Sequence, residues 1–252
     1  MDVLVCVKRV PATGGRITLT DDERGIDTKS LGFTVSPHEE CAVEEAVRIT
    51  EQHGGSSVVL TLGPEAAEEQ LRDALALGIE RGVLLETDEL WGPEATAEAI
   101  AVAIVEQETP FDLLMFGNES ADAADYQVGI RVAHALDMPC VTGVKSLEIV
   151  DGKAIARREG SDGIEVFELE LPAVVTVKEG INVPRYPSIP GRLKAKKKEI
   201  ARVAVERPEE TIDSVKLILP PGRASQVEVL GTGKDAAAAV VDMLLDLKLV
   251  AP

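Results

Sequence analysis

The fold is decided by residues 36–62, SPHEECAVEEAVRITEQHGGSSVVLTL. Ser36 suits the N-cap of a helix, Pro37 suits its first turn, and Glu39 completes a capping box. Apolar residues then recur at helical spacing until a Gly-Gly pair ends the helix. The continuous apolar run Ser57–Leu62 is typical of a strand that is buried on both faces. This stretch therefore predicts a helix followed directly by a parallel strand.

The alternation of strand and helix continues on both sides of this stretch. Further strands are predicted at Val3–Val7, Gly82–Glu86, Asp112–Phe116 and Pro172–Val177. Further helices are predicted at Ala66–Leu77, Pro93–Gln107 and Asp125–Leu136. Such a pattern, repeated about every 20 to 30 residues, predicts an α/β fold with a doubly wound, mostly parallel sheet.

Two regions depart from this alternation. Alternating runs predict an antiparallel meander, with strands at Gly143–Ile149, Lys153–Arg158 and Gly163–Leu171. Arg16–Thr20 is predicted to be a separate strand outside the sheet, and a last helix is predicted at Gly233–Lys248. We expect one α/β nucleotide-binding domain, residues 1–199, which includes the meander (143–171) and a loop (182–199). Residues 200–252 are expected to form a C-terminal arm that packs on a partner.

Net charge, cysteine pattern and the length of the apolar runs exclude several classes of protein. The chain has 252 residues and a net charge of −18, which argues against wholesale nucleic-acid binding. Its three cysteines are unpatterned, so we expect a reducing cytoplasm and no structural metal. We expect neither a signal peptide nor a membrane span, because no apolar run approaches about 20 residues.

Residues 182–199, NVPRYPSIPGRLKAKKKE, stand out from the rest of the chain, and we call them the proline-framed loop. Pro184, Pro187 and Pro190 restrict the backbone, so Val183–Gly191 is predicted to be a stiff extended rod without helix. A basic run follows in an otherwise acidic chain. The residues leave two interpretations open: a loop that binds a partner, or an ordered crossover followed by a solvated basic helix.

Four segments are predicted to meet at the carboxyl edge of the sheet, where open α/β sheets bind ligands. They are Cys6, Ser36–Glu39, Leu62-Gly63-Pro64 and the stretch from Gly117 to Ala133. The last begins GNESADAADYQVG, which would present backbone N–H groups to an anion such as an adenine nucleotide. It is neither a GxGxxG fingerprint nor a P-loop, and an ordinary strand-to-helix turn is the alternative. No catalytic set is recognisable, which favours a binding or carrier protein.

Several motifs resemble one known family. They are VKRV (Val7–Val10), SPHEECAVEEAVRI (Ser36–Ile49), LPAVVTV (Leu171–Val177) and PRYPSIPGRLKAKKKEI (Pro184–Ile200). With them, the chain resembles the beta subunit of electron transfer flavoprotein over essentially its whole length. The resemblance implies a sheet of the adenine-nucleotide alpha hydrolase-like type. It also implies a heterodimer with an alpha subunit, which carries the redox FAD.

The resemblance further implies an electron carrier with no catalytic residues of its own. Such carriers accept electrons from acyl-CoA dehydrogenases or related donors in fatty acid oxidation. They pass them to a quinone oxidoreductase or another acceptor.

The family's beta subunit holds a nucleotide, usually AMP as a structural ligand. By position, its pocket here comprises Cys6, Ser36, Pro37, His38, Glu39, Leu62, Gly63, Asp122, Ala123, Ala124, Asp125, Tyr126, Gln127, Val128, Gly129 and Ala133. This sequence departs from the AMP-binding pattern, since Ser36 replaces an Asn and Gln127-Val128-Gly129 resembles the electron-bifurcating members. Those members bind a second FAD in the same pocket, but Ala123 and Ala124 depart from their pattern too. We therefore expect AMP, with a second FAD as the alternative.

The resemblance also assigns a recognition loop that docks the donor dehydrogenase. It comprises Arg185, Tyr186, Pro187, Ser188, Ile189, Pro190, Gly191, Arg192, Leu193 and Lys194. Ile189 takes the place of the family's anchor leucine. Lys194–Lys198 is left open between binding an acidic surface of the dehydrogenase and bracing the loop on this chain's own carboxylates. Glu159 matches a carboxylate that pairs with an arginine of the alpha subunit and restrains domain motion.

Two other classes remain as alternatives. One is a nucleotide-binding regulatory module of the stress-protein kind, which shares the sheet topology but needs no proline-framed loop. The other is an adenylating or ATP-hydrolysing enzyme, against which the absence of a P-loop counts.

Overall fold

The computed structural model describes residues 1–12, 14, 17–107, 109–209, 211, 216–221 and 228–250. The chain divides into two compact units, Met1–Lys216 and Leu217–Pro252. In the second unit, a 3-10 turn η2 (Gly233–Ala236) leads into helix α6 (Ala237–Asp246), which confirms the predicted last helix.

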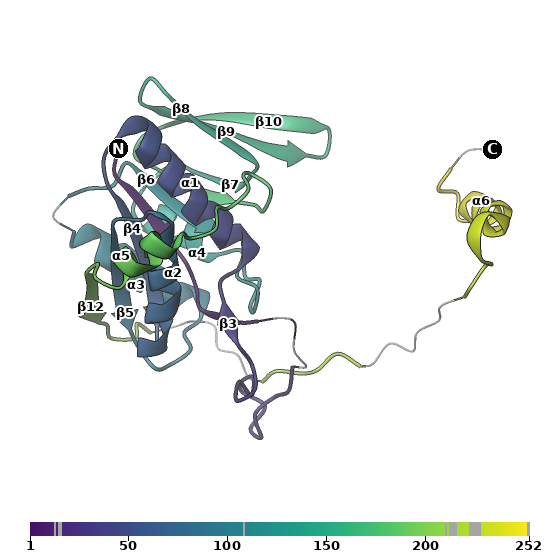
Figure 1. Cartoon of the computed structure of the whole chain (residues 1–252), viewed down its shortest axis with the longest axis horizontal. Coiled ribbons are helices and arrows are strands. Elements are labelled where there is room, and N and C mark those ends of the chain that lie inside the picture. Colours follow the sequence, from purple (N-terminus) through teal and green to yellow (C-terminus); the bar gives the residue numbers. More distant parts are fainter. Residues whose placement is uncertain are drawn as a thin grey trace. The chain divides into compact units, whose positions relative to one another are not determined.

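The first unit is built on a seven-stranded sheet in which every neighbouring pair is parallel (Figure 1). The order is β12-β5-β4-β1-β6-β11-β7. The strands are β1 (Val3–Cys6), β4 (Ser57–Gly63), β5 (Arg81–Glu86), β6 (Leu113–Gly117), β7 (Cys140–Val144), β11 (Ala173–Val177) and β12 (Ile200–Ala204). The parallel strands predicted from continuous apolar runs are thereby confirmed.

Helices cover both faces of this sheet, because successive strand residues point to opposite sides. In β1, Val3 and Val5 join one apolar core, whereas Leu4 and Cys6 join the other. The first core is covered by α1 (Pro37–His53), α2 (Glu68–Leu77, preceded by the turn η1, Glu65–Ala67) and α5 (Ile189–Ala195). The second is covered by α3 (Pro93–Val105) and α4 (Val128–Ala135). The doubly wound fold class is confirmed.

The antiparallel meander is present as β8 (Ser146–Val150), β9 (Lys153–Gly160) and β10 (Gly163–Glu170), seen at the top of Figure 1. Its first strand was predicted wrongly as one run, Gly143–Ile149. The structure divides that run, because β7 belongs to the parallel sheet and β8 to the meander. Gly143 has a left-handed φ of 71°, and the pairing of β7 with β11 shifts in register there. The backbone turn at this glycine lets the chain leave the sheet.

Two helix boundaries differ from the sequence predictions. The helix expected from Asp125 begins instead at Val128, because Ala124 and Tyr126 have left-handed φ values of 50° and 59°. Val183–Gly191 was wrongly predicted to lack helix. Helix α5 begins at Ile189, since Pro190 lies in the first turn, where no backbone donor is needed.

The edges of the α/β unit also hold short or unexpected pairings. Residues 200–204, expected in the arm, form β12 and pair with β5 at the sheet edge. Leu19 makes only an isolated bridge to Ile26, and Arg16 lies outside the described residues. The short strands β2 (Val10–Pro11) and β3 (Phe33–Thr34) pair with each other.

The capping box of α1 generates a stability prediction. Ser36 Oγ accepts from the Glu39 N–H, and Glu39 accepts in return from the Ser36 N–H. We expect Ser36→Ala to lower the free energy of unfolding by about 1–2 kcal/mol, because one helix N–H loses its acceptor. Ser161→Ala, an exposed serine in the turn between β9 and β10, is the control and should change little. Equal effects of the two substitutions in urea unfolding would contradict the role of the cap.

Candidate functional site

The candidate site lies beside β1, the strand at which the strand order of the parallel sheet reverses direction. From β1 the chain passes through α1 to β4 on one side, whereas β6 pairs with β1 on the other side. In open α/β sheets, the carboxyl edge at this topological switch point forms a crevice for ligands. The start of α1 and the segment after β6 meet there, and we call this region the switch-point site.

Glu39 lies at the centre of the switch-point site, where it ties three segments together. The oxygens of its carboxyl group accept hydrogen bonds from the backbone N–H of Lys8 (2.9 Å) and of Ser36 (2.8 Å). Gly117, at the end of β6, lies directly beneath it. A Cβ atom added to Gly117 would be 2.7 Å from Glu39 Cγ, so only glycine allows this close approach. The end of β1, the start of α1 and the end of β6 are therefore held together around one carboxyl group.

The electrostatics of Glu39 follow from its burial. Burial raises the pKa of the Glu39 carboxyl to about 8, although the hydrogen bonds from Ser36 and Lys8 and the Lys8 charge lower it. The same environment acts on Cys6, whose thiol has a pKa raised by burial and, to a lesser degree, by Glu39. Cys6 is thus a buried thiol rather than a reactive one.

Lys8 connects this centre to the segment that precedes α4. Its Nζ lies 2.9 Å from the carboxylate of Asp122, which also accepts from the Ala123 N–H at 2.8 Å. Burial alone would raise the pKa of Asp122, but Lys8 and these hydrogen bonds lower it overall. Asp122 is therefore held ionised, with Lys8 as its partner.

A second set of contacts involves Glu119. Ser36 Oγ donates to the Glu119 carbonyl oxygen at 3.1 Å. His38 Nδ1 accepts from the Glu179 N–H at 2.7 Å, so in the neutral ring the proton is on Nε2, 3.2 Å from Glu119 Oε1. Tyr126 also hydrogen-bonds to the Glu119 side chain, which raises the pKa of its hydroxyl. One edge of the site is thus a connected polar network.

The structure brings some of the predicted pocket residues together and leaves others in the core. Ser36, His38 and Glu39 adjoin the Lys8–Asp122 pair, as described above. Pro37 is the first residue of α1, and Leu62 and Gly63 end β4. By contrast, Cys6 and Ala133 lie in the apolar core, and Gly129 lies against Phe116 and Thr176, where an added Cβ would be 2.8 Å from Thr176 Cγ2. Asp125 and Gln127 precede α4, and no side chain caps that helix at Gln127.

Lys8 was not identified from the sequence, whereas Gly117 and Glu119 lie in the predicted stretch from Gly117 to Ala133 but were given no role of their own. A glycine that directly follows a predicted strand was the available signal for Gly117. No local pattern indicated Lys8 or Glu119, because their partners lie far away in the sequence.

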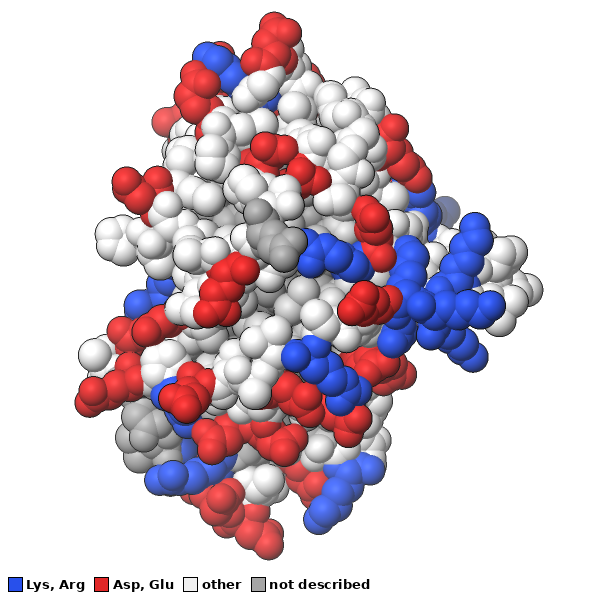
Figure 2. All heavy atoms as spheres, turned by 90° about the vertical axis from the view of Figure 1, so that its left-hand side faces the viewer, with Lys and Arg blue, Asp and Glu red and all other residues white. Residues whose placement is uncertain are grey.

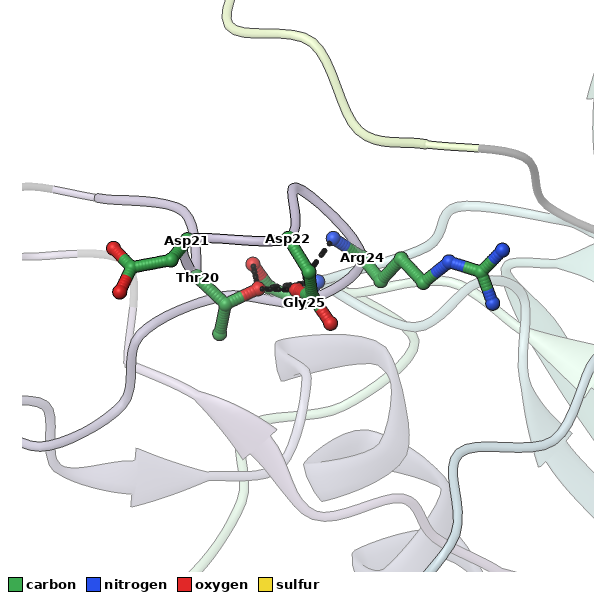
Figure 3. A pocket seen from close by; sticks show the side chains of 5 residues that line it. All are labelled: Thr20, Asp21, Asp22, Arg24 and Gly25. Atoms are coloured by element: carbon green, nitrogen blue, oxygen red, sulfur yellow. Dashed lines mark hydrogen bonds between the residues drawn. The ribbon is translucent and has the colours of Figure 1, made fainter.

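Two surface hollows lie apart from the switch-point site. One is lined by Thr20, Asp21, Asp22, Arg24 and Gly25, and Figure 3 shows the Thr20 hydroxyl turned toward Asp22 and Gly25 while the Arg24 guanidinium points away. The other, about 360 Å³, lies between α1 and β8. Among the described residues, no group of three His, Cys, Asp or Glu side chains is placed to hold a metal ion. No helix in that part of the chain has both the length and the apolar character of a membrane span.

The proline-framed loop presents apolar side chains from a braced backbone. Tyr186 is 96% exposed and Ile189 is 78% exposed. Ile189 is the first residue of α5, which packs on α2 so closely that a Cβ on Gly191 would lie 2.6 Å from the Ala76 carbonyl oxygen. Arg72 of α2 donates to the carbonyl oxygens of Ala195 (2.7 Å) and Lys198 (2.6 Å).

The basic run divides into one inward lysine and several outward groups. Lys198 Nζ donates to the carbonyl oxygens of Leu75 and Ile79 at the end of α2, so it braces the loop on backbone oxygens. Arg192, Lys194, Lys196 and Lys197 are exposed. Figure 2, drawn from the side of α5 and β12, shows basic side chains gathered at one margin of a face on which acidic groups are frequent. Glu159 is exposed near the end of β9 and, among the described residues, its side chain has no hydrogen-bond or ion-pair partner.

The fold and the two sites define a doubly wound α/β protein with a switch-point site and a braced apolar loop. The family model for the electron transfer flavoprotein domain matches residues 25–208. The chain is 32% identical to the electron transfer flavoprotein subunit beta of Bacillus subtilis over 252 residues, which cover 97% of each chain. It is 36% identical to that of Syntrophomonas wolfei (91% of this chain, 90% of the relative) and 34% identical to that of Bradyrhizobium diazoefficiens (95% and 96%). The chain belongs to the electron transfer flavoprotein family, among its beta subunits.

Glu39 generates a prediction about pH. Its folded-state pKa of about 8 is above the ordinary value of 4.5, so the folded protein binds the extra proton. The stability that this proton provides is complete below pH 4.5 and is lost as the pH rises toward 8, by up to about 1.4 kcal/mol per pH unit. Glu39→Gln cannot lose a proton. We expect its free energy of unfolding to depend less on pH between 5.5 and 8.5 than that of the native protein.

Urea unfolding at several pH values measures this difference. Glu98→Gln, which changes an exposed carboxylate on α3, is the control and should keep the native pH dependence. The same slope in Glu39→Gln as in the native protein would show that Glu39 does not titrate in this range.

Proposed function

We propose that this chain is the beta subunit of a heterodimeric electron carrier, in which the redox FAD is bound mainly by the alpha subunit. The carrier accepts electrons from acyl-CoA dehydrogenases or related donors and passes them to a quinone oxidoreductase or another acceptor. The observation that carries this proposal is the braced proline-framed loop, which exposes Ile189 at the start of α5. Exposed apolar side chains on a rigid support are typical of a docking site, because little conformational entropy is lost on binding.

The switch-point site would hold a nucleotide, which we propose to be AMP as a structural ligand. The uncapped start of α4 suits a phosphate, since backbone N–H groups at a helix start favour an anion, and Lys8, paired with Asp122, would add a positive charge to the site. Ser36, His38 and Glu39 would line the same site from the start of α1. A second FAD is the alternative, favoured by the Gln127-Val128-Gly129 sequence.

Within the carrier, this chain would do no bond-making chemistry of its own. FAD supplies the electron transfer when bound in the complex. Ile189 would anchor the donor dehydrogenase by inserting into an apolar pocket. Glu159, exposed and without a partner among the described residues, is available to pair with an arginine of the alpha subunit and restrain its motion. The residues beyond β12 would form the arm that packs on that subunit.

The two alternative classes have less support. A regulatory module of the stress-protein kind needs no braced apolar loop, and the family relationship extends over the loop as well as the sheet. For an adenylating or ATP-hydrolysing enzyme, the sequence offers no P-loop.

Co-expression with an alpha subunit tests the proposed assembly. We expect a yellow heterodimer with one FAD and one AMP, because the switch-point site suits a small anionic nucleotide. Acid extraction followed by chromatography identifies the released nucleotides. Two FAD molecules per heterodimer would contradict the AMP assignment, and a colourless homodimer would contradict the proposed function.

The loop generates a prediction about docking. Ile189→Ala should weaken docking of the donor dehydrogenase by about 30-fold, because a buried apolar anchor contributes about 2 kcal/mol. The measurement is the apparent KM of the dehydrogenase for the heterodimer. Ile164→Ala, which changes a similarly exposed isoleucine on β10 (71% against 78% for Ile189), is the matched control and should leave this KM unchanged. An unchanged KM for Ile189→Ala would show that the anchor is elsewhere.

A further inference from the structure

The part of the proline-framed loop that precedes α5 has almost no backbone hydrogen bonds of its own. Between Val183 and Ile189, the Arg185 amide is the only backbone N–H with an acceptor among the residues that the structure describes. That acceptor is the Glu44 carboxylate of α1, at 3.1 Å. The path of this segment is therefore set by side chains of another element.

Arg185 makes a dense set of contacts with α1. Its Nε and Nη2 donate to Glu44 at 2.9 and 3.1 Å. Its Nη1 and Nη2 donate to Glu51 at 2.7 and 2.9 Å. Glu44 and Glu51 are two helical turns apart on α1 and so lie on one face, because a turn takes about 3.6 residues. We call these three residues the Arg185 clamp.

The two carboxylates of the clamp differ in their surroundings. The Glu44 side chain is only 6% exposed, so its charge is little screened by solvent and depends on Arg185 as a partner. The Glu51 side chain is 58% exposed, and the hydrogen bond from Arg185 lowers its pKa. A planar guanidinium that binds two carboxylates fixes both the position and the direction of the backbone at Arg185.

The clamp lies next to the exposed apolar side chains. Tyr186 follows Arg185 directly, and Pro187 links it to the Ser188 N-cap of α5, whose Oγ accepts from the Gly191 N–H at 3.1 Å. On the other side, Asn182 Nδ2 donates to Glu45 Oε2 at 2.8 Å and to the Cys41 carbonyl oxygen at 3.0 Å. The segment is thus held on α1 before Tyr186 and on α2 after Ile189.

We propose that Glu44 and Glu51 are positioning residues for the docking of the electron donor, acting through Arg185. They hold Tyr186 and Ile189 in the orientation that the donor binds, so that the loop loses little conformational entropy on docking. They touch neither the donor nor the flavin. This inference rests on the proposed docking function of the loop and adds the residues of α1 that make it possible.

Docking kinetics of the intact heterodimer with its dehydrogenase test the clamp. Glu44→Gln keeps the size of the side chain and loses its charge. We expect it to raise the apparent KM for the heterodimer about five- to tenfold with little change in kcat. The substitution loosens the loop before the dehydrogenase binds and leaves the electron-transfer step itself unaltered. Arg185→Gln should do the same, and the double variant should be no worse than either single variant, since both substitutions break one interaction. Glu98→Gln on α3 is the matched control, expected to keep the native KM.

Trypsin cleavage gives a readout that general destabilisation would not reproduce. In the native protein the Arg185 side chain is held by α1 and is not available to the protease. Glu44→Gln and the milder Glu51→Gln should both speed cleavage after Arg185, while cleavage after other basic residues stays at its native rate.

The outcomes separate the clamp from the docking function itself. A raised KM together with faster cleavage after Arg185 supports the clamp. If Ile189→Ala raises the KM but Glu44→Gln and Glu51→Gln do not, the clamp is overturned and the docking loop stands. If Ile189→Ala has no effect either, both are overturned. If Glu44→Gln fails to fold, Glu51→Gln decides the question alone, because Glu51 is exposed.

Discussion

The structure depends on how helix α1 is fixed at its first turn. Glu39, buried in this first turn, accepts hydrogen bonds from the backbone of Ser36 and of Lys8, so the helix start and the end of the central strand share one carboxyl group. Gly117 allows the neighbouring strand to pass directly under this group. A buried carboxyl with its hydrogen bonds satisfied fixes geometry strongly, because any displacement leaves a polar group without a partner.

Once α1 is fixed, it serves two functional regions of the chain. Its first turn carries Ser36 and His38 at the switch-point site, and its later turns carry Glu44, Glu45 and Glu51 to the proline-framed loop. The nucleotide proposed for the switch-point site and the electron donor proposed for the loop would therefore share one rigid support. For the proposed carrier, this shared support would give the donor a preformed surface to bind.

The sequence predicted the parts of this structure that depend on local signals. The capping box at Ser36 and Glu39, the continuous apolar runs and the turn residues predicted five of the seven strands of the parallel sheet and the helix that follows its first strand. The predictions failed where a distant contact or a left-handed backbone conformation determines where an element begins or which sheet it joins. Gly143 divides one predicted strand between two sheets, left-handed residues delay α4 to Val128, and β12 is a strand because β5 offers an edge. The partners Lys8–Asp122 and Arg185–Glu44 are more than 100 residues apart, so no local pattern indicates them.

The most direct test of this account is hydrogen exchange of the assembled heterodimer with and without its donor dehydrogenase. Among the residues that the structure describes, the backbone N–H groups of Tyr186, Ser188 and Ile189 have no acceptor, so they exchange quickly until a partner covers them. The account predicts that the dehydrogenase slows exchange at these amides and in α5, and leaves the meander strands β8–β10 unchanged. Slowed exchange in the meander, with none in the proline-framed loop, would contradict it.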